Sequence, residues 1–278
     1  MSNLTLPQAE PQPLLADLQP TAAFMRSSMQ ESADTLRQRL ATDGYLYLPG
    51  ALDPAPLLAA RRDILTLCSA AGWLDPTQPL MDGIAAISGL SEADEAYKPV
   101  YRQVVRLPSF NACAVTPELR EIFRTVLGGE PFAHPRNIAR IGFPGHHATQ
   151  PHQDFHYIRG TTETYTCWIP TADVPAELGG LAVLPRSHRC GFLTHQRTSG
   201  AGGMGVAVDH LSDVGPWTGG DFRLGDLLLF HSYTIHGARS HRAQQRIRLS
   251  FDFRYQRPAD PIDPSSLCYH MEDQHPSA

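Results

Sequence analysis

Residues 246–255 read RIRLSFDFRY, a run in which polar and apolar side chains alternate at every position. Successive side chains of a β-strand point to opposite faces of its sheet, so this run predicts a strand with one polar and one apolar face. The polar face would carry Arg246, Arg248, Ser250, Asp252 and Arg254, and the apolar face Ile247, Leu249, Phe251 and Phe253. Because unpaired buried charge is costly, a polar face turned inward requires ion pairs or a bound partner.

Similar short runs, broken by Gly and Pro, fill the chain from residue 131 onward. They lie at 136–143, 150–158, 163–170, 181–184 and 226–230. Several short strands at this spacing are typical of an antiparallel sandwich or barrel. The Gly-rich segment 195–220 is expected to be a long loop, and its 199–205 part, together with 73–100, is a candidate lid over a substrate.

The first 130 residues show helix signals instead. One helix is expected over 28–42, where apolar residues recur at helical spacing before Gly44. A second begins at Asp53, a favourable N-cap followed by Pro, and runs to about Ala71. The rest of this region is expected to hold a strand at 44–50, an irregular stretch at 73–100 and a helix at about 117–127.

Composition narrows the class of protein. The 278 residues are 42% hydrophobic and carry a net charge of −5, which disfavours nucleic acid as a partner. No apolar run approaches the ~20 residues that span a bilayer, so no membrane association is expected. The five scattered cysteines and the lack of a secretory signal indicate a cytoplasmic protein. We expect a flexible arm at 1–20, one domain over 21–258 and an irregular tail at 259–278.

Three residues form a candidate metal site. His152 and Asp154 lie two positions apart in a predicted strand and would share a face. His236 follows 84 positions later in GDLLLFHSYTIHG (225–237), and the Gly after it permits close backbone approach. Two imidazoles and one carboxylate leave about three of six octahedral positions open, an arrangement associated with non-haem Fe(II) oxygenases.

Other histidines compete for these roles. His231 lies five residues before His236 and would face the opposite side of an extended chain, as a residue at a strand end. His156 shares the predicted face of His152 and Asp154, and would line a substrate cavity or pack structurally. His146 and His147 are adjacent and are interpreted as loop residues.

The strand at 246–255 offers a carboxylate anchor. Arg248 can grip a carboxylate with two parallel hydrogen bonds, and Ser250, on the same face, can add a third. Arg246 is the nearest competitor, but it lies farther from that serine. The same face could instead form cross-strand ion pairs, for which Asp252 and Arg254 are candidates.

Together these motifs resemble the phytanoyl-CoA dioxygenase family of Fe(II)/2-oxoglutarate oxygenases over roughly residues 30–257. The resemblance is carried by DGYLYLPGAL (43–52), HQD (152–154), GGLAVLPRSH (179–188), GDLLLFHSYTIHG (225–237) and RLSFDFRYQ (248–256). It implies a mostly β fold, a double-stranded β-helix (jelly-roll) core with flanking helices packed on one sheet. The cofactors would be Fe(II), 2-oxoglutarate and O2.

The resemblance also implies roles for single residues. His152, Asp154 and His236 would bind iron, and Arg248 with Ser250 would hold the distal carboxylate of 2-oxoglutarate. Trp168 would wall the co-substrate or pack in the core, and Asn137 and Thr149 are candidate donors to it. Lys98, Arg102 and Arg106 would receive an anionic substrate group or form a solvated face. Arg186 stands where many relatives have Gly, and would cap the site entrance or be solvated.

The implied activity is hydroxylation of an unactivated C–H bond in a small molecule, with succinate and CO2 as products. The substrate could be a natural product, an amino-acid-like compound, a phosphonate or an acyl compound. Halogenating relatives lack the carboxylate and bind chloride in its place, so Asp154 predicts oxygenation or desaturation. Two alternatives stay open: a demethylase of the AlkB type, which the spacing of Arg248 and Arg254 resembles, and a non-catalytic jelly-roll binding protein. The sequence specifies neither the substrate nor the oligomeric state.

Overall fold

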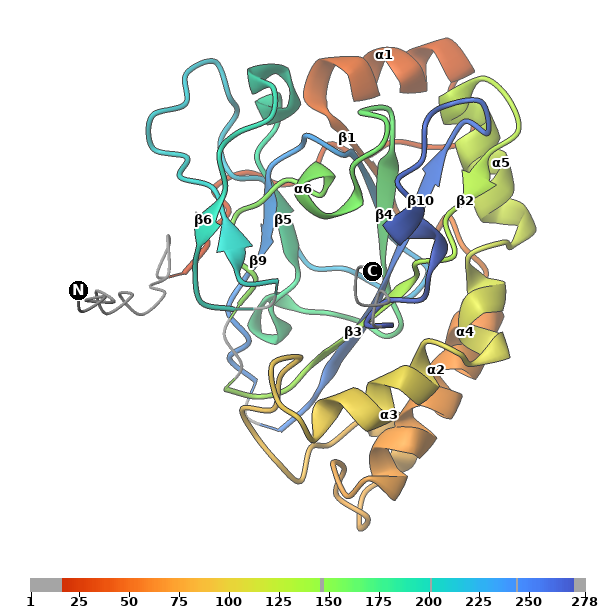
Figure 1. Cartoon of the computed structure of the whole chain (residues 1–278), viewed down its shortest axis with the longest axis vertical. Helices are drawn as coiled ribbons and strands as arrows, with labels where there is room; N and C mark the ends of the chain where they lie inside the picture. The colour runs from red at the N-terminus through yellow and green to blue at the C-terminus, as the bar shows by residue number, and fades with distance from the viewer. Residues whose placement is uncertain (1–16, 146–147, 201, 244, 273–278) are drawn as a thin grey trace, which may run out of the picture.

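The computed structural model describes residues 17–145, 148–200, 202–243 and 245–272, and these form two facing β-sheets, with helices on one of them, and a separate small hairpin (Figure 1). The larger sheet has the order β1-β8-β4-β10-β2, and β3 pairs with β10 on the same side as β2. Its strands, all antiparallel, are β1 (Tyr45–Leu48), β2 (Phe132–Ala133), β3 (Ile138–Gly142), β4 (Tyr165–Pro170), β8 (Leu227–His231) and β10 (Arg248–Gln256).

The smaller sheet pairs β5 (Leu181–Val183) with β9 (His236–Ala238). An isolated bridge joins His152 to His236, and another joins Val183 to Thr218, so further segments extend this layer. A separate hairpin lies within the segment 195–220 that is expected to be a loop. Its strands, β6 (Gln196–Arg197) and β7 (Met204–Gly205), have two residues each.

Five helices pack on the outer face of the larger sheet, and in Figure 1 they run from α1 at the top down the right side to α3 at the bottom. They are α1 (Ala33–Asp43), α2 (Pro54–Ala70), α3 (Tyr97–Val104), α4 (Pro108–Cys113) and α5 (Pro117–Leu127). The side chains of Ser32 and Asp53 cap α1 and α2, and Gly44 ends α1 at a φ of 79°. Short 3₁₀ turns occur at Leu80–Asp82, Ala176–Leu178, Ser187–Cys190 and Pro264–Leu267.

Alternation along the strands separates two apolar layers. In β8, Leu227 and Leu229 pack toward the helices, whereas Leu228 and Phe230 pack between the sheets. In β10 the apolar residues from Leu249 to Tyr255 face the helices, so its polar residues face inward. The expected fold, a mostly β jelly-roll core with helices on one sheet, is confirmed.

Two local expectations are wrong. The run 150–158 is not a strand, because Asp154 has helical backbone angles and begins the short helix α6 (Phe155–Ile158). The stretch 73–100 is irregular only until α3 begins at Tyr97. The tail packs against the domain, because Ser266 is buried and its hydroxyl donates to the carbonyl of Ile158 at 3.2 Å.

Some expectations lie partly or wholly outside the described residues. These include most of the arm at 1–20, the end of the tail, and the loop positions of His146 and His147. The division into arm, domain and tail stays a prediction. Within the described residues, none of the helices combines the length and apolar character needed to cross a membrane.

Candidate metal centre

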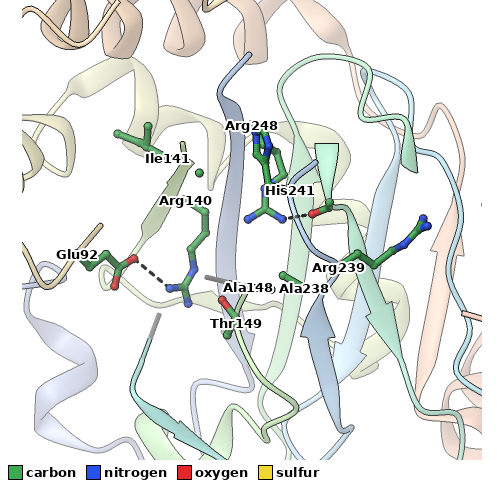
Figure 2. Close-up of a pocket in the computed structure, with 11 residues that line it drawn as sticks. Glu92, Arg140, Ile141, Ala148, Thr149, Ala238, Arg239, His241 and Arg248 are labelled. Carbon is green, nitrogen blue, oxygen red and sulfur yellow. Dashed lines mark hydrogen bonds and ion pairs between the residues drawn. The ribbon is translucent and has the colours of Figure 1, made fainter. Parts of the chain in front are cut away.

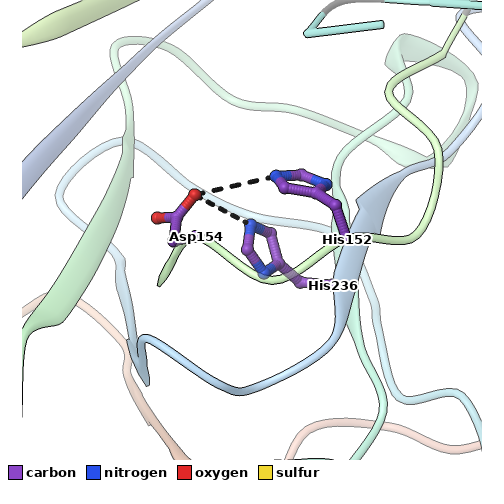
Figure 3. Close-up of side chains that lie close together, drawn as sticks. All are labelled: His152, Asp154 and His236. Atoms are coloured by element: carbon purple, nitrogen blue, oxygen red, sulfur yellow. Dashed lines mark ion pairs between the residues drawn. The ribbon is translucent and has the colours of Figure 1, made fainter. Parts of the chain in front are cut away.

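Three buried side chains meet between the two sheets (Figure 3). Oδ1 of Asp154 lies 3.7 Å from Nε2 of His152 and 3.7 Å from Nε2 of His236. The bridge between the two histidines holds their backbones side by side, with N–O distances of 3.0 and 3.1 Å. All three donor atoms lie within 4.8 Å of one another, which is compatible with one shared metal ion.

Backbone carbonyls orient both imidazoles. Nδ1 of His152 lies 2.8 Å from the carbonyl oxygen of Gln150, and Nδ1 of His236 lies 2.9 Å from that of Thr234. Only a protonated Nδ1 can donate to a carbonyl, so each neutral ring keeps its lone pair on Nε2. Metal-binding histidines are usually held in this way.

The carboxylate is oriented as firmly. Oδ2 of Asp154 accepts a 2.5 Å hydrogen bond from Thr166 and lies 3.4 Å from the guanidinium of Arg254. Burial alone would raise the pKa of Asp154, but Arg254 and the two imidazoles hold it well below its usual value. Burial lowers the pKa of His236 to about 3. At neutral pH the cluster therefore offers a carboxylate and at least one neutral imidazole, donors that suit Fe(II).

The glycine after His236 has the expected role. A Cβ on Gly237 would lie 3.1 Å from the carbonyl oxygen of Thr149 and 3.3 Å from the nitrogen of Pro151. Only glycine lets the segment 149–151 lie this close to residue 237 without either segment moving. This close packing holds His152 next to His236.

The competing histidines lie elsewhere. His231 faces Glu163 at 3.7 Å, and its Nδ1 accepts the N–H of Tyr233 at 3.0 Å. His156 lies on α6, where its ring stacks on His195 with centroids 4.3 Å apart. Its predicted position on the face of His152 rested on the strand that the structure does not contain.

A cavity beside the three side chains is also lined by Thr149, Trp168 and Arg248, and is called here the Arg248 cavity. An adjoining cavity, drawn in Figure 2, continues past Arg248 and Arg140. Arg248 donates to the carbonyl of Gly179, but its Nε and the Oγ of Ser250 are buried without a hydrogen-bond partner among the described residues. Such unsatisfied donors are costly unless a ligand fills them, so this cavity fits a bound carboxylate.

Other candidates fall outside these cavities. Asn137 lies on the same face as Ala139 and Ile141, which pack toward the helices. Its side-chain amide donates to Oδ1 of Asn111 on α4 at 2.9 Å. This placement does not fit a contact with the co-substrate. Lys98 and Arg102 lie on α3, on the outer side of the larger sheet, and Lys98 pairs with Glu95.

Arg186 has a left-handed backbone, with a φ of 68°, a conformation that glycine adopts at the least cost. Its Nε donates to the carbonyl of Asp213 at 3.1 Å.

The sequence did not indicate a third cavity, called here the Arg136 cavity. Its walls include Arg136, Arg140, Arg254 and His270, and it adjoins His152. Arg136 and Arg140 share the inward face of the β3 region with Ile138, so alternation along 136–142 was the signal that could have revealed them.

Comparison with known proteins agrees with this geometry. Residues 40–250 match the profile of a family described as phytanoyl-CoA dioxygenase. A 1-deoxypentalenic acid 11-beta-hydroxylase from Streptomyces exfoliatus is 26% identical over 204 residues, which cover 69% of either chain.

Two solved structures share the fold. The non-heme alpha ketoglutarate dependent carbocyclase SnoK from nogalamycin biosynthesis has a TM-score of 0.60 at 18% identity, over 87% of this chain and 90% of its own. The epimerase SnoN, solved with Fe3+, alpha ketoglutarate and nogalamycin RO, has a TM-score of 0.58 at 20% identity, over 84% and 86%.

Proposed function

The chain belongs to the phytanoyl-CoA dioxygenase family of Fe(II)/2-oxoglutarate-dependent oxygenases, and we propose that it hydroxylates an unactivated C–H bond of a small molecule. In this proposal His152, Asp154 and His236 bind the iron. The observation that carries it is the convergence of their donor atoms within 4.8 Å in a buried position. The similarity to a hydroxylase of 1-deoxypentalenic acid supports hydroxylation of a natural-product-like substrate.

The chain's own residues prepare the site before any ligand arrives. The carbonyls of Gln150 and Thr234 hold Nδ1–H of the two imidazoles, so that each neutral ring presents its Nε2 lone pair, and Thr166 fixes the carboxylate. Bound iron and 2-oxoglutarate would supply the oxidising power for C–H cleavage, with succinate and CO2 as products. Because Asp154 fills the carboxylate position, we expect an oxygenated or desaturated product and no chlorinated one.

The Arg248 cavity would receive 2-oxoglutarate. Its distal carboxylate would take up the free Nε–H of Arg248 and the hydroxyl of Ser250, two buried groups without a hydrogen-bond partner among the described residues. Trp168 would wall the same cavity, and Thr149 lies where it can contact the co-substrate. The alternative of a non-catalytic binding protein is disfavoured because the metal donors and the carboxylate anchor are all present.

The proposal is tested by anaerobic titration with Fe(II) and 2-oxoglutarate, followed by measurement of succinate formation in air. A weak visible absorption band is expected when both are bound. Asp154→Ala and His236→Ala should abolish that band and the succinate. His231→Ala, five residues away on the same segment, is the matched control and should retain both. Turnover that persists in either ligand variant would remove these residues from the metal site.

A further inference from the structure

The Arg136 cavity brings three guanidinium groups to one side of the candidate metal centre. Arg136 and Arg140 come from the β3 region and Arg254 from β10, and His152 forms part of the same wall. His270 is contributed by the tail, and its Nδ1 lies 2.9 Å from the hydroxyl of Tyr101. Burial and the three nearby arginines hold the pKa of His270 well below its usual value, so this imidazole adds no charge.

Carboxylates neutralise only part of this cluster. Arg140 lies 2.9 Å from Asp252 and 3.1 Å from Glu92, so two acidic groups surround it. The guanidinium of Arg136 donates to the carbonyl of Ser265 at 3.1 Å, and no carboxylate lies within 4.0 Å of it in the described part of the chain. Arg254 has Asp154 as its acidic neighbour, at 3.4 Å.

Arg136 is the one of the three arginines that lacks a carboxylate in ion-pair contact. Arg140 pairs with Asp252 and Glu92, and Arg254 with Asp154, whereas Asp263 acts on Arg136 only from beyond 4.0 Å. A partly buried guanidinium without a paired carboxylate is costly, and an anionic ligand relieves that cost.

An unfilled donor points to the same place. The side chain of Arg254 is only 3% exposed, so water does not reach its Nε. This nitrogen also has no hydrogen-bond partner among the described residues. Arg254 lines the cavity that Arg136 also lines. A guanidinium pair with free N–H groups is well suited to a carboxylate, which accepts several hydrogen bonds at once.

We propose that the substrate is a monocarboxylic acid whose carboxylate binds Arg136 and the free Nε–H of Arg254 in the Arg136 cavity. This inference rests on the proposed function, because it places the substrate beside His152. It also replaces the expectation that Lys98 and Arg102 receive an anionic group, since those residues lie on the outer helix α3.

The test is a screen of linear and cyclic monocarboxylic acids of eight to twenty carbons, each paired with its primary amide. Stimulated succinate formation gives kcat and KM for every pair. Acids should exceed their amides by at least about tenfold in kcat/KM, since the amide lacks the charge. Arg136→Gln should lower kcat/KM for the acid by roughly 10- to 100-fold, mainly through KM. Arg136→Lys, which keeps the charge, should lose less, and Lys98→Gln should match the wild type.

The outcomes separate the two proposals. Three results would each overturn the carboxylate site. The first is an equal kcat/KM for the amides and their acids, and the second is a panel in which no acid stimulates turnover. The third is an Arg136→Gln variant with the same kcat/KM for acids as the wild type. Failure of the wild type to convert any 2-oxoglutarate to succinate, with or without added compounds, would count against the oxygenase function instead.

Discussion

Oγ1 of Thr166 donates a 2.5 Å hydrogen bond to Oδ2 of Asp154, which leaves Oδ1 as the oxygen that faces both imidazoles. Thr166 lies on β4, a rigid central strand between β8 and β10. The carboxylate therefore approaches a metal through one oxygen, while the second oxygen is anchored to the sheet. Both atoms of this contact are buried, so water cannot replace the lost hydrogen bond.

Removal of that hydroxyl should weaken the metal site without unfolding the sheet. Thr166→Val keeps the branched shape that a strand favours, and we expect Fe(II) affinity to fall by about 10- to 100-fold. Thr166→Ser retains the hydroxyl and is the matched control. Anaerobic Fe(II) titration measures the effect. Equal iron affinity in Thr166→Val and the wild type would show that Asp154 needs no anchor.

Arg248, which lines the Arg248 cavity, and Ser250, two residues farther along the same face of β10, should control 2-oxoglutarate binding. Ser250→Ala removes one hydrogen bond and should raise KM for 2-oxoglutarate by roughly tenfold, and Arg248→Lys should raise it more because the two-pronged contact is lost. Arg246→Lys tests the competitor that the sequence left open and should change KM little. If Arg246→Lys had the larger effect, the anchor would have to be reassigned.

Alternation along the strands made much of this architecture predictable. In β10 the inward and outward sets follow directly from RIRLSFDFRY, because every second residue is polar. The three donor residues were also recognisable. His236 begins β9 and is followed by a glycine, as its motif indicates, whereas the strand expected to align His152 and Asp154 is absent and the turn into α6 brings the two together instead. Their use as iron ligands is the part that stays a prediction.

Long-range contacts decided what the sequence did not reveal. Phe155, Tyr157 and Ile158 favour strands by propensity, yet they form α6, whose first N–H donates to the carbonyl of Ser232 at 3.1 Å. The Arg136 cavity was hidden in the same way. Its wall is completed by His270, and nothing local in the tail indicates that the chain returns to the site.

The close approach at Gly237 should make this position intolerant of any side chain. Gly237→Ala would place a methyl group 3.1 Å from the carbonyl oxygen of Thr149, so either that segment or His236 must move. We expect a loss of about 1–3 kcal/mol in the free energy of unfolding, together with weaker Fe(II) binding. Gly129→Ala is the control, because a Cβ there meets no atom within 4 Å. Equal stability of the two variants in urea would contradict the argument.

A buried histidine outside the candidate metal site should make stability depend on pH. His134 is buried, and its Nε2–H donates to Oε1 of Gln256 at 2.8 Å, while its Nδ1 has no partner in the described residues. Burial lowers the pKa of His134 to about 4, whereas an unfolded histidine titrates near 6.5. Between these values the unfolded chain binds a proton that the folded chain does not, so stability falls as the pH falls.

His134→Gln removes this titration and keeps an N–H for Gln256. From about pH 7.5 to pH 5 the wild type should lose about 2 kcal/mol more of its unfolding free energy than the variant does. Urea denaturation of both proteins at the two pH values measures the difference, and contributions from the other histidines cancel in the comparison. Identical losses in the two proteins would mean that His134 is protonated in the folded protein. Its burial opposes this, and so does its Nδ1, because a charged ring would have no acceptor for the proton on that nitrogen.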